Sequence, residues 1–426
     1  MRGLVHVPLK KEATNLEWTI KRTPPASNLD IPFDSTRQRL VVNVGDPVVS
    51  GQMLAEPTHP EAVSVHSSAA GRIAEIVQAR LASGLFSEAI RVQSDRWEEK
   101  SLPAAKEIHD WQNLGFKEGL QILQRSGVVE MFPDGGALHA GLAEAKQKKI
   151  DALILNACEQ EPYVTSTYAL CMSHPVEVLK GLEIIRRILE PQKTRVAFQD
   201  NIPDALELFK SKIFFLKWNH LTLQSVPALY PQGENTVLAR TLLGMKKNGD
   251  WDQLEKVFVV NPATAFAVYE AVACGKPFYE RAVTISGECV ARPKNLWVRM
   301  GTRFQDAAKN CKGVLREPGR ILSGGPMRGL AQPDWETVLA AETDAIIALP
   351  KEVVKPSKVD PCIRCGDCSE ACPVDISPMM ITLASERDMK DLARAYGVEE
   401  CIECGNCSYV CPSNRPMLEL LQYAKS

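Results

Sequence analysis

The stretch CIRCGDCSEACPVD (residues 362–375) places four cysteines in a short run, and the same pattern returns in CIECGNCSYVCPSN (residues 401–414). Each run has the spacing C-x2-C-x2-C-x3-C, and a proline follows its last cysteine. Thiolates at this spacing can wrap three corners of an iron–sulfur cubane, and in two-cluster ferredoxins the fourth cysteine of each run ligates the other cluster. The two runs therefore predict two 4Fe–4S clusters and a role in electron transfer.

This crossed pattern divides the cysteines of the two runs into two ligand sets. One cluster is assigned to Cys362, Cys365, Cys368 and Cys411. The other cluster is assigned to Cys372, Cys401, Cys404 and Cys407. Zinc is the alternative metal, but zinc sites are usually built from two CxxC pairs with a longer gap between them. Two triple-CxxC runs, each closed by Cys-Pro, favour iron–sulfur over zinc.

The bulk composition excludes several classes of protein. The formal net charge of −2 leaves no overall basic field for a nucleic-acid backbone. The first residues have no long apolar stretch typical of a secretory leader, so we expect the chain not to be secreted. In such a chain, thirteen cysteines argue against a disulfide framework and for bound metal. The sequence contains no run of eighteen apolar residues, the length that indicates a membrane-spanning helix. We therefore expect a protein of the cytosol, or one that docks peripherally on a membrane complex.

The N-terminal third is rich in short β-like runs. VGDPVVSGQML (residues 44–54) and HSSAAG (residues 66–71) resemble the flattened barrel of biotinyl and lipoyl carrier domains. A carrier of that kind presents a lysine at a hairpin tip, and the tip here has none. We therefore expect a barrel with a structural role.

From about residue 112 the pattern alternates between buried strands and helices, which predicts a mostly parallel sheet with helices on both faces. Ligands of such sheets bind at the carboxyl ends of the strands. The loops expected there are NACEQEPY (156–163), YPQGEN (230–235) and NPATAF (261–266).

The order of these segments, followed by the two cysteine runs, resembles the RnfC family of the Rnf electron-transport complex over nearly the whole chain. The middle part is similar to the flavin-binding NADH subunit of respiratory complex I. The resemblance implies a multidomain α/β fold with five segments: a barrel-sandwich-like β domain (1–100), an α/β flavin/NADH-type domain (112–275), a β-grasp module of the SLBB type (280–330), a linker (331–360) and a helical di-cluster ferredoxin-like domain (361–426).

The family resemblance also implies a function and a location. It predicts a peripheral subunit on the cytoplasmic face of the cell membrane, with the other Rnf subunits as partners. Such a complex couples electron exchange between ferredoxin and NAD to ion translocation, and its RnfC member holds FMN at an NADH site. The residues that the resemblance assigns to the flavin pocket are Gly127, Gly135, His139, Glu159, Glu161 and Gly233.

The chain departs from the family in its flavin loop. The family loop is glycine-rich, of the form AGIVGMGGAGFPTH, whereas this chain reads SGVVEMFPDGGALH (residues 126–139). Glu130, Phe132 and Pro133 replace glycines, and Pro133 also removes an N–H donor. Glu130 and Asp134 add negative charge where a phosphate would bind. These changes oppose the anion-binding use of backbone N–H groups.

Two interpretations of the pocket remain open at this point. The site binds FMN and NADH through altered contacts, or it is degenerate and the subunit receives electrons from another donor without oxidising NADH itself. The lost glycines favour the second interpretation. An alternative function is a soluble flavin and iron–sulfur reductase, such as a cobalamin reductase. A non-redox adaptor is a third hypothesis, and the intact cysteine runs argue against it.

Overall fold

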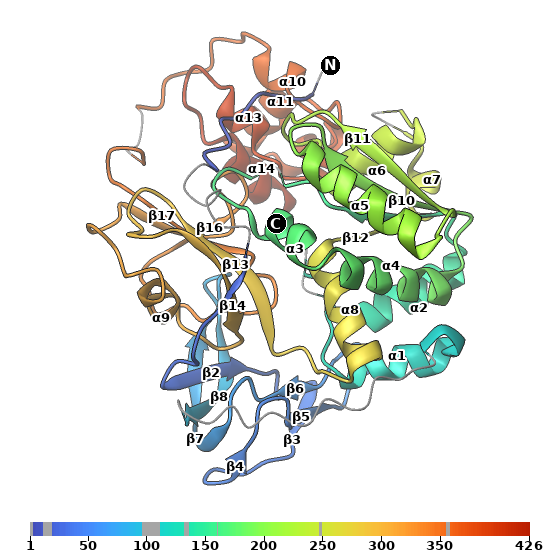
Figure 1. Ribbon diagram of the computed structural model, residues 1–426. Coiled ribbons are helices and arrows are strands. Elements are labelled where there is room, and N and C mark those ends of the chain that lie inside the picture. Colours follow the sequence, from blue (N-terminus) through green and yellow to red (C-terminus); the bar gives the residue numbers. More distant parts are fainter. Residues whose placement is uncertain are drawn as a thin grey trace.

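The computed structural model describes residues 3–11, 19–95, 111–131, 136–159, 161–246, 249–354 and 358–426. Four parts meet in the middle of the molecule (Figure 1). A β barrel lies at the bottom of this view, an α/β domain on the right, a second sheet on the left and the cysteine-rich module on top. The multidomain α/β fold expected from the sequence is confirmed.

The barrel consists of two antiparallel sheets, with strand orders β2-β8-β7-β4 and β3-β5-β6. Its strands are β2 (Asn28–Pro32), β3 (Gln38–Leu40), β4 (Pro47–Val48), β5 (Met53–Pro57), β6 (Val65–His66), β7 (Gly71–Arg80) and β8 (Phe86–Ser94). The tip that would carry a cofactor in a carrier domain (residues 66–71) is buried in this protein. It packs against the second sheet, where the Ser68 hydroxyl donates to the Met300 carbonyl at 2.7 Å. The barrel therefore serves as a support for its neighbours.

The α/β domain is built on a parallel sheet with the order β11-β10-β9-β12. Its strands are β9 (Ala152–Asn156), β10 (Lys193–Gln199), β11 (Leu221–Val226) and β12 (Val257–Val260). Its helical elements are η1 (Trp111–Asn113), α1 (Phe116–Arg125), α2 (Leu138–Lys148), α3 (Ser166–Ser173), α4 (Pro175–Leu189), α5 (Pro203–Leu216), α6 (Asn235–Leu243), α7 (Trp251–Leu254) and α8 (Pro262–Cys274).

Alternation along the strands supplies apolar side chains to both faces of this sheet. Leu153 and Leu155 of β9 join the large core formed with α2, α4, α5 and α8. Ile154, between them, packs with Leu238 of α6 on the other face. A strand that is buried on both faces reads as a continuous apolar run, as in ALILN. This two-sided burial places β9 in the interior of the domain.

The second sheet has six strands in the order β1-β14-β13-β17-β15-β16. Its elements are β1 (Lys21–Arg22), β13 (Glu280–Ser286), β14 (Lys294–Arg299), α9 (Phe304–Lys309), β15 (Arg320–Ser323), β16 (Leu330–Gln332) and β17 (Ala345–Leu349). Here the structure differs from the sequence-based expectation of a linker over residues 331–360, because β17 is a fully buried central strand. The polar residues on either side of this short apolar run hid the strand.

The cysteine-rich module consists of short helical segments. They are α10 (Asp367–Glu370), α11 (Pro378–Ser385), α12 (Lys390–Ala395), η2 (Val398–Glu400), α13 (Asn406–Tyr409) and α14 (Met417–Lys425). Its apolar core joins cysteine side chains with Ile381, Val398 and Leu421. Among the helices of the described ranges, none is both long enough and apolar enough to cross a membrane.

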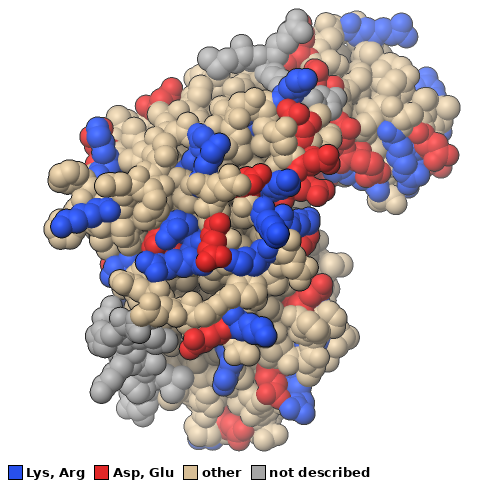
Figure 2. Space-filling view, turned by 90° about the vertical axis from the view of Figure 1, so that its right-hand side faces the viewer, with Lys and Arg blue, Asp and Glu red and all other residues tan. Residues whose placement is uncertain are grey.

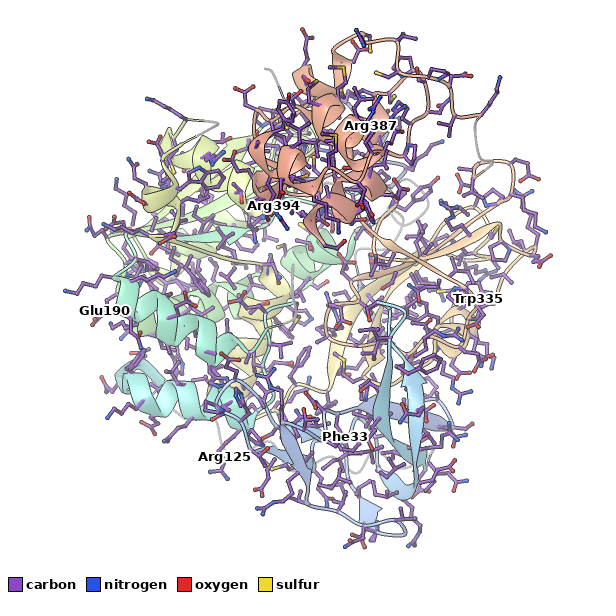
Figure 3. The ribbon with its side chains drawn as sticks, turned by 180° about the vertical axis from the view of Figure 1, so that it is seen from behind. Phe33, Arg125, Glu190, Trp335, Arg387 and Arg394 are labelled. Carbon is purple, nitrogen blue, oxygen red and sulfur yellow. The ribbon has the colours of Figure 1, made fainter. Side chains whose placement is uncertain are left out.

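The first described residues (3–11) form an N-terminal strap between the cysteine-rich module and the α/β domain. The Gly3 N–H donates to the Glu370 carbonyl at 2.9 Å. The Val5 and Tyr230 backbones exchange two hydrogen bonds, of 2.7 and 2.8 Å. The N-terminal strap thus lies against the C-terminal module, and Figure 3 shows the cysteine-rich module seated over the α/β domain from behind.

The contact between α4 and α8 provides a test of this packing. A Cβ atom added at Gly181 would lie 1.7 Å from the Ala265 carbonyl oxygen, so the helices must separate. We expect Gly181→Ala to destabilise the domain by about 1–3 kcal/mol, the usual cost of overpacking, measured by urea unfolding. Gly119→Ala in α1 is the matched control, because its Cβ would meet only side-chain atoms at 3.2 Å. Equal unfolding midpoints for the two variants would contradict this packing.

Candidate functional site

The first cysteine set surrounds a cavity in the cysteine-rich module. The cavity is lined by Cys362, Cys365, Cys368 and Cys411, together with apolar atoms of Met379 and Met417. Cys365 is exposed, whereas Cys368 is buried. Three of these thiols come from the first run and one from the second, so the structure brings together the four residues assigned to the first cluster.

The second cysteine set lies deeper in the molecule. Burial, together with the neighbouring Cys401 and Cys372 thiols, raises the pKa of the Cys404 thiol to about 12. Burial also raises the pKa of the Cys407 thiol, and the neighbouring Cys404, Cys401 and Cys372 thiols contribute to this rise. Cys372 of the first run therefore lies among the three cysteines of the second run. This is the second assigned set.

Backbone N–H groups around these thiols offset the effect of burial. The Glu403 N–H donates to the Cys401 Sγ at 3.4 Å. Hydrogen bonds from the Asn406 and Ile376 backbones lower the pKa of Cys404 and Cys372 respectively. Such N–H donors stabilise negative charge on cluster sulfurs and tune reduction potentials. Gly366 and Gly405 hold the loops with φ of +90° and +79°.

The donor chemistry and the cavity together fit iron–sulfur clusters. The cavity is lined by four thiols, and thiolate is the usual ligand of a 4Fe–4S cluster. In the described ranges, no group of three or more His, Cys, Asp or Glu side chains is arranged to hold a single metal ion, whereas four thiols line the cavity of the first set.

The second cysteine set lies against the α/β domain. The Tyr230 hydroxyl donates to the Cys404 carbonyl at 2.7 Å, and it lies 3.5 Å from the Glu161 Oε1 atom. Val7 of the N-terminal strap packs with both Tyr230 and Cys404. The second set is thus enclosed at this contact, whereas the first set reaches the surface through Cys365.

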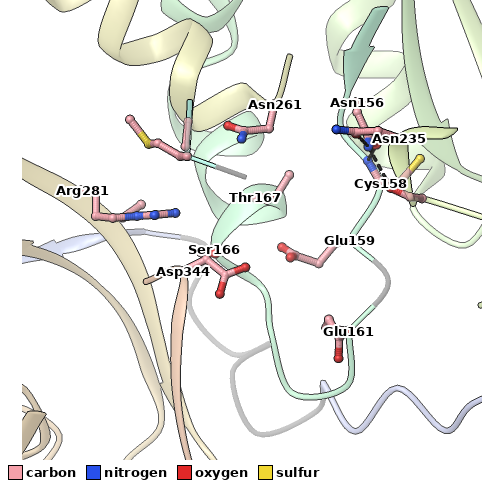
Figure 4. A pocket seen from close by; sticks show the side chains of 14 residues that line it. Asn156, Cys158, Glu159, Glu161, Ser166, Thr167, Asn235, Asn261, Arg281 and Asp344 are labelled. Carbon is pink, nitrogen blue, oxygen red and sulfur yellow. Dashed lines mark hydrogen bonds between the residues drawn. The ribbon is translucent and has the colours of Figure 1, made fainter. Parts of the chain in front are cut away.

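A pocket lies at the carboxyl edge of the parallel sheet, where the three expected loops meet (Figure 4). The loops contribute Asn156, Cys158, Glu159, Glu161, Gly233, Asn235, Asn261 and Ala263, and the rest of the lining consists of Met131, Ser166, Thr167, Arg281, Ala282 and Asp344. The Asn156 amide fixes two of the loops, because it donates to the Gly233 carbonyl at 2.8 Å and to the Asn235 side chain at 2.9 Å.

Three of the residues predicted for a flavin pocket line this cavity: Glu159, Glu161 and Gly233. Gly127 and His139 do not line it. A Cβ at Gly127 would lie 2.6 Å from the Ser64 carbonyl oxygen, and His139 Nε2 lies 2.8 Å from the Pro60 carbonyl oxygen, so both face the barrel. Gly135 lies outside the described residues.

Sequence reasoning missed Arg281 and Asp344, which enter the pocket from the second sheet. It also missed Lys11 of the N-terminal strap, which donates a hydrogen bond to the Glu159 carbonyl. None of these residues belongs to a motif, and no spacing relates them to the loops of the α/β domain. The sequence feature that could have indicated Asp344 is its position immediately before the apolar run of β17.

The pocket holds buried charge of both signs. The Glu159 and Asp344 carboxylates and the Arg281 guanidinium point into the same space (Figure 4). Burial raises the pKa of Glu159 and of Asp344, and it raises the pKa of Glu161 to about 7. Burial lowers the pKa of Arg281, whose Nε atom is buried with no hydrogen-bond partner.

The described part of the flavin loop does not fit a phosphate group. The Glu130 N–H donates to the Gly136 carbonyl at 2.8 Å, and the Met131 N–H donates to the Thr264 hydroxyl at 3.1 Å. Both donors are therefore occupied within the protein. The Glu130 carboxylate packs over α2, where a Cβ at Gly141 would lie 2.7 Å from it. Residues 132–135, which include Phe132, Pro133 and Asp134, lie outside the described residues.

Four family models match successive parts of the chain. They are an RnfC barrel sandwich hybrid domain (residues 1–97), a Nuo51 FMN-binding domain (123–270), an SLBB domain (282–331) and a 4Fe-4S dicluster domain (356–412). These matches follow the same order as the barrel, the α/β domain, the second sheet and the cysteine-rich module.

Curated relatives align along almost the whole chain. The C subunit of the proton-translocating ferredoxin:NAD(+) oxidoreductase complex of Clostridium ljungdahlii is 34% identical, over 100% of this chain and 93% of the relative. The Na(+)-translocating counterpart of Acetobacterium woodii is 30% identical, over 92% of this chain and 88% of the relative. An NAD+-reducing NiFe hydrogenase in the air-oxidized state superimposes with a TM-score of 0.52 at 15% identity, over 77% of this chain and 70% of that chain, which indicates a shared fold.

The buried Glu161 carboxyl gives a pH-dependent contribution to stability. Its pKa is raised from 4.5 to about 7 in the folded state. Between these two values the folded protein holds a proton that the unfolded chain has lost, so stability falls as pH rises from about 4.5 to about 7 and stays level above. We expect Glu161→Gln to remove this contribution to the decrease in stability, measured as the free energy of unfolding in urea across that pH range.

The control for this prediction is Glu190→Gln. Glu190 is an exposed acid paired with Lys146 at 2.6 Å, and this pairing lowers its pKa. That variant should keep the fall in stability. If Glu161→Gln has the same pH profile of stability as the parent, the carboxyl is already ionised in the folded protein between pH 4.5 and about 7, and its pKa is not raised.

Proposed function

The chain belongs to the RnfC family, and on this basis we propose that it is the peripheral electron-transfer subunit of an Rnf-type ion-translocating membrane complex. The observation that carries the proposal is the grouping of the cysteines into two sets of four, each drawn from both runs. When bound, 4Fe–4S clusters supply one-electron transfer. We propose that each set holds one cluster.

The residues around each set support different roles. Tyr230, Val7 and the burial of Cys404 keep water from the second set and hold it against the α/β domain. The exposed Cys365 puts the first set within reach of a partner, and Ile363, which lines the same cavity, is 67% exposed. Apolar surface beside a redox centre favours close approach of another redox protein, so we propose that the partner contacts the module here.

We further propose that the pocket of the α/β domain does not hold FMN in this chain, although the domain matches the FMN-binding family. The occupied N–H groups of Glu130 and Met131 support this view, as do the pocket carboxylates. On this proposal the subunit does not oxidise NADH itself. Electrons reach or leave it through another subunit or through ferredoxin, and its own chemistry is limited to holding the clusters.

The names of the relatives support partnership with the other subunits of a ferredoxin:NAD oxidoreductase complex. We propose attachment to the cytoplasmic face of the membrane, where ferredoxin and NAD are available. No feature of the described residues favours the alternative of a soluble cobalamin reductase.

The crossed ligand sets can be tested by serine substitution and EPR of the dithionite-reduced protein. Cys411→Ser should alter the same signal as Cys365→Ser, because both thiols line one cavity. Cys372→Ser should alter the same signal as Cys404→Ser. Cys311→Ser is the control and should leave both signals unchanged, because this buried thiol lies in the apolar core that packs against the second sheet. If Cys411→Ser instead matches Cys404→Ser, the ligand sets are not crossed.

The proposal on FMN requires a separate experiment. The protein is purified anaerobically and analysed for iron, sulfide and flavin, and NADH is then added in a spectrophotometer. We expect iron and sulfide without stoichiometric FMN, and clusters that bleach with dithionite and not with NADH. Stoichiometric FMN together with bleaching by NADH would overturn the view that the pocket lacks flavin.

A further inference from the structure

The edge of the parallel sheet opposite the pocket carries a lysine at or just before the start of every strand. In sheet order β11-β10-β9-β12, these are Lys217, Lys193, Lys149 and Lys256. All four are exposed. Neighbouring strands lie about 4.8 Å apart, so the row extends over roughly 15 Å. Because the strands are parallel, this edge is necessarily the one that points away from the pocket.

Two phenylalanines protrude beside this row. Helix α5 ends at the same edge, and its Phe214 and Phe215 are 85% and 79% exposed. These are the highest values for large apolar side chains in the described ranges. We call the surface formed by Phe214, Phe215 and the four lysines the lysine–phenylalanine edge. The parallel sheet and α5 lie on the right of Figure 1, and Figure 2 turns that side of the molecule toward the viewer, where basic side chains form a band with acidic ones among them.

The acidic groups of this edge leave the four lysines unneutralised. Glu190 pairs with Lys146 at 2.6 Å, and Glu144 pairs with Lys148 at 2.9 Å. Asp151 accepts a hydrogen bond from the Gln192 amide at 2.9 Å, and Glu255 is exposed nearby. Among the described residues, none of the four lysines forms an ion pair.

We propose that the lysine–phenylalanine edge docks on the anionic headgroup surface of a membrane. Aromatic side chains that protrude from a folded surface enter the interfacial region of a bilayer, and flanking lysines are attracted to anionic lipids. The two exposed phenylalanines and the four lysines without ion pairs therefore match the apolar and anionic parts of a lipid surface.

This inference rests on the proposed location of the subunit at a membrane, and it adds an orientation. With the amino edge of the sheet on the lipid, the pocket at the carboxyl edge opens away from the membrane. The proposed lipid contact buries little protein surface. It therefore supplements the contacts that this subunit makes with other subunits and does not replace them.

The test uses the full-length, cluster-loaded protein and co-sedimentation with vesicles. One set of vesicles is phosphatidylcholine alone, and the other is an equimolar mixture with phosphatidylglycerol. We expect binding to the anionic vesicles that is at least about tenfold stronger and is weakened by added salt. Equal binding to both vesicle types, or no binding to either, would overturn the proposal.

Two variants locate the contact. Phe214→Ser with Phe215→Ser should reduce binding to anionic vesicles about tenfold, whereas Leu85→Ser with Phe86→Ser should not. The control pair is 69% and 62% exposed on the barrel hairpin. Lys193→Gln, Lys217→Gln and Lys256→Gln together should reduce anionic binding about tenfold, unlike Lys309→Gln, Lys351→Gln and Lys358→Gln. Equal losses in variants and controls would overturn the assignment to this edge.

A third measurement shows whether the partner of this edge is lipid or protein. It also tests lipid docking separately from the proposed electron-transfer function. If both sets of edge variants bind vesicles normally but fail to join membranes that contain the other subunits, the edge is a protein interface and the lipid proposal is wrong. Iron content and EPR signals are recorded on every variant. Intact signals with lost vesicle binding support lipid docking, while absent signals in the parent protein would overturn the electron-transfer function instead.

Discussion

The contact between Tyr230 and Cys404 is the constraint on which the arrangement of this molecule depends. A hydroxyl of the α/β domain donates to the backbone of a cluster-binding loop. The N-terminal strap forms a pair of backbone hydrogen bonds with Tyr230, and its Val7 packs against both Tyr230 and Cys404. Since thiolates hold a cluster only when their loops are fixed, this contact couples domain docking to cofactor binding. It also explains why the first and last segments of the chain lie together.

The pocket of the α/β domain is stabilised by neighbours that have no part in the sheet. The Glu161 carboxylate accepts a hydrogen bond from the Met327 N–H at 3.0 Å, and Gly325 allows that loop to close, because a Cβ there would lie 2.4 Å from the same carboxylate. Burying several carboxylates costs free energy unless they are protonated or paired. Lys11 and Arg281 supply part of that compensation.

The polarity of the parallel sheet separates the roles of its two edges. Loops at the carboxyl edge converge on the pocket and the cysteine-rich module, whereas the amino edge carries short connections with lysines and the exposed end of α5. Parallel strands joined by helices produce this separation automatically, because every strand begins at one edge and ends at the other. One surface is therefore free for attachment while the opposite one forms the interior contacts.

The amino-acid sequence alone was enough to predict the parallel sheet and the three loops of the pocket, because the alternation of apolar residues encodes the strands and the points where they end. The spacing of the cysteines predicts two ligand sets, and that assignment stays a prediction. Tertiary packing was needed to show that β17 completes the second sheet, that Arg281, Asp344 and Lys11 enter the pocket, and that Gly127 and His139 face the barrel. These contacts join residues far apart in the chain, and they depend on how whole domains dock. No local pattern records that docking, since its free energy comes from complementary surfaces that exist only after each domain has folded.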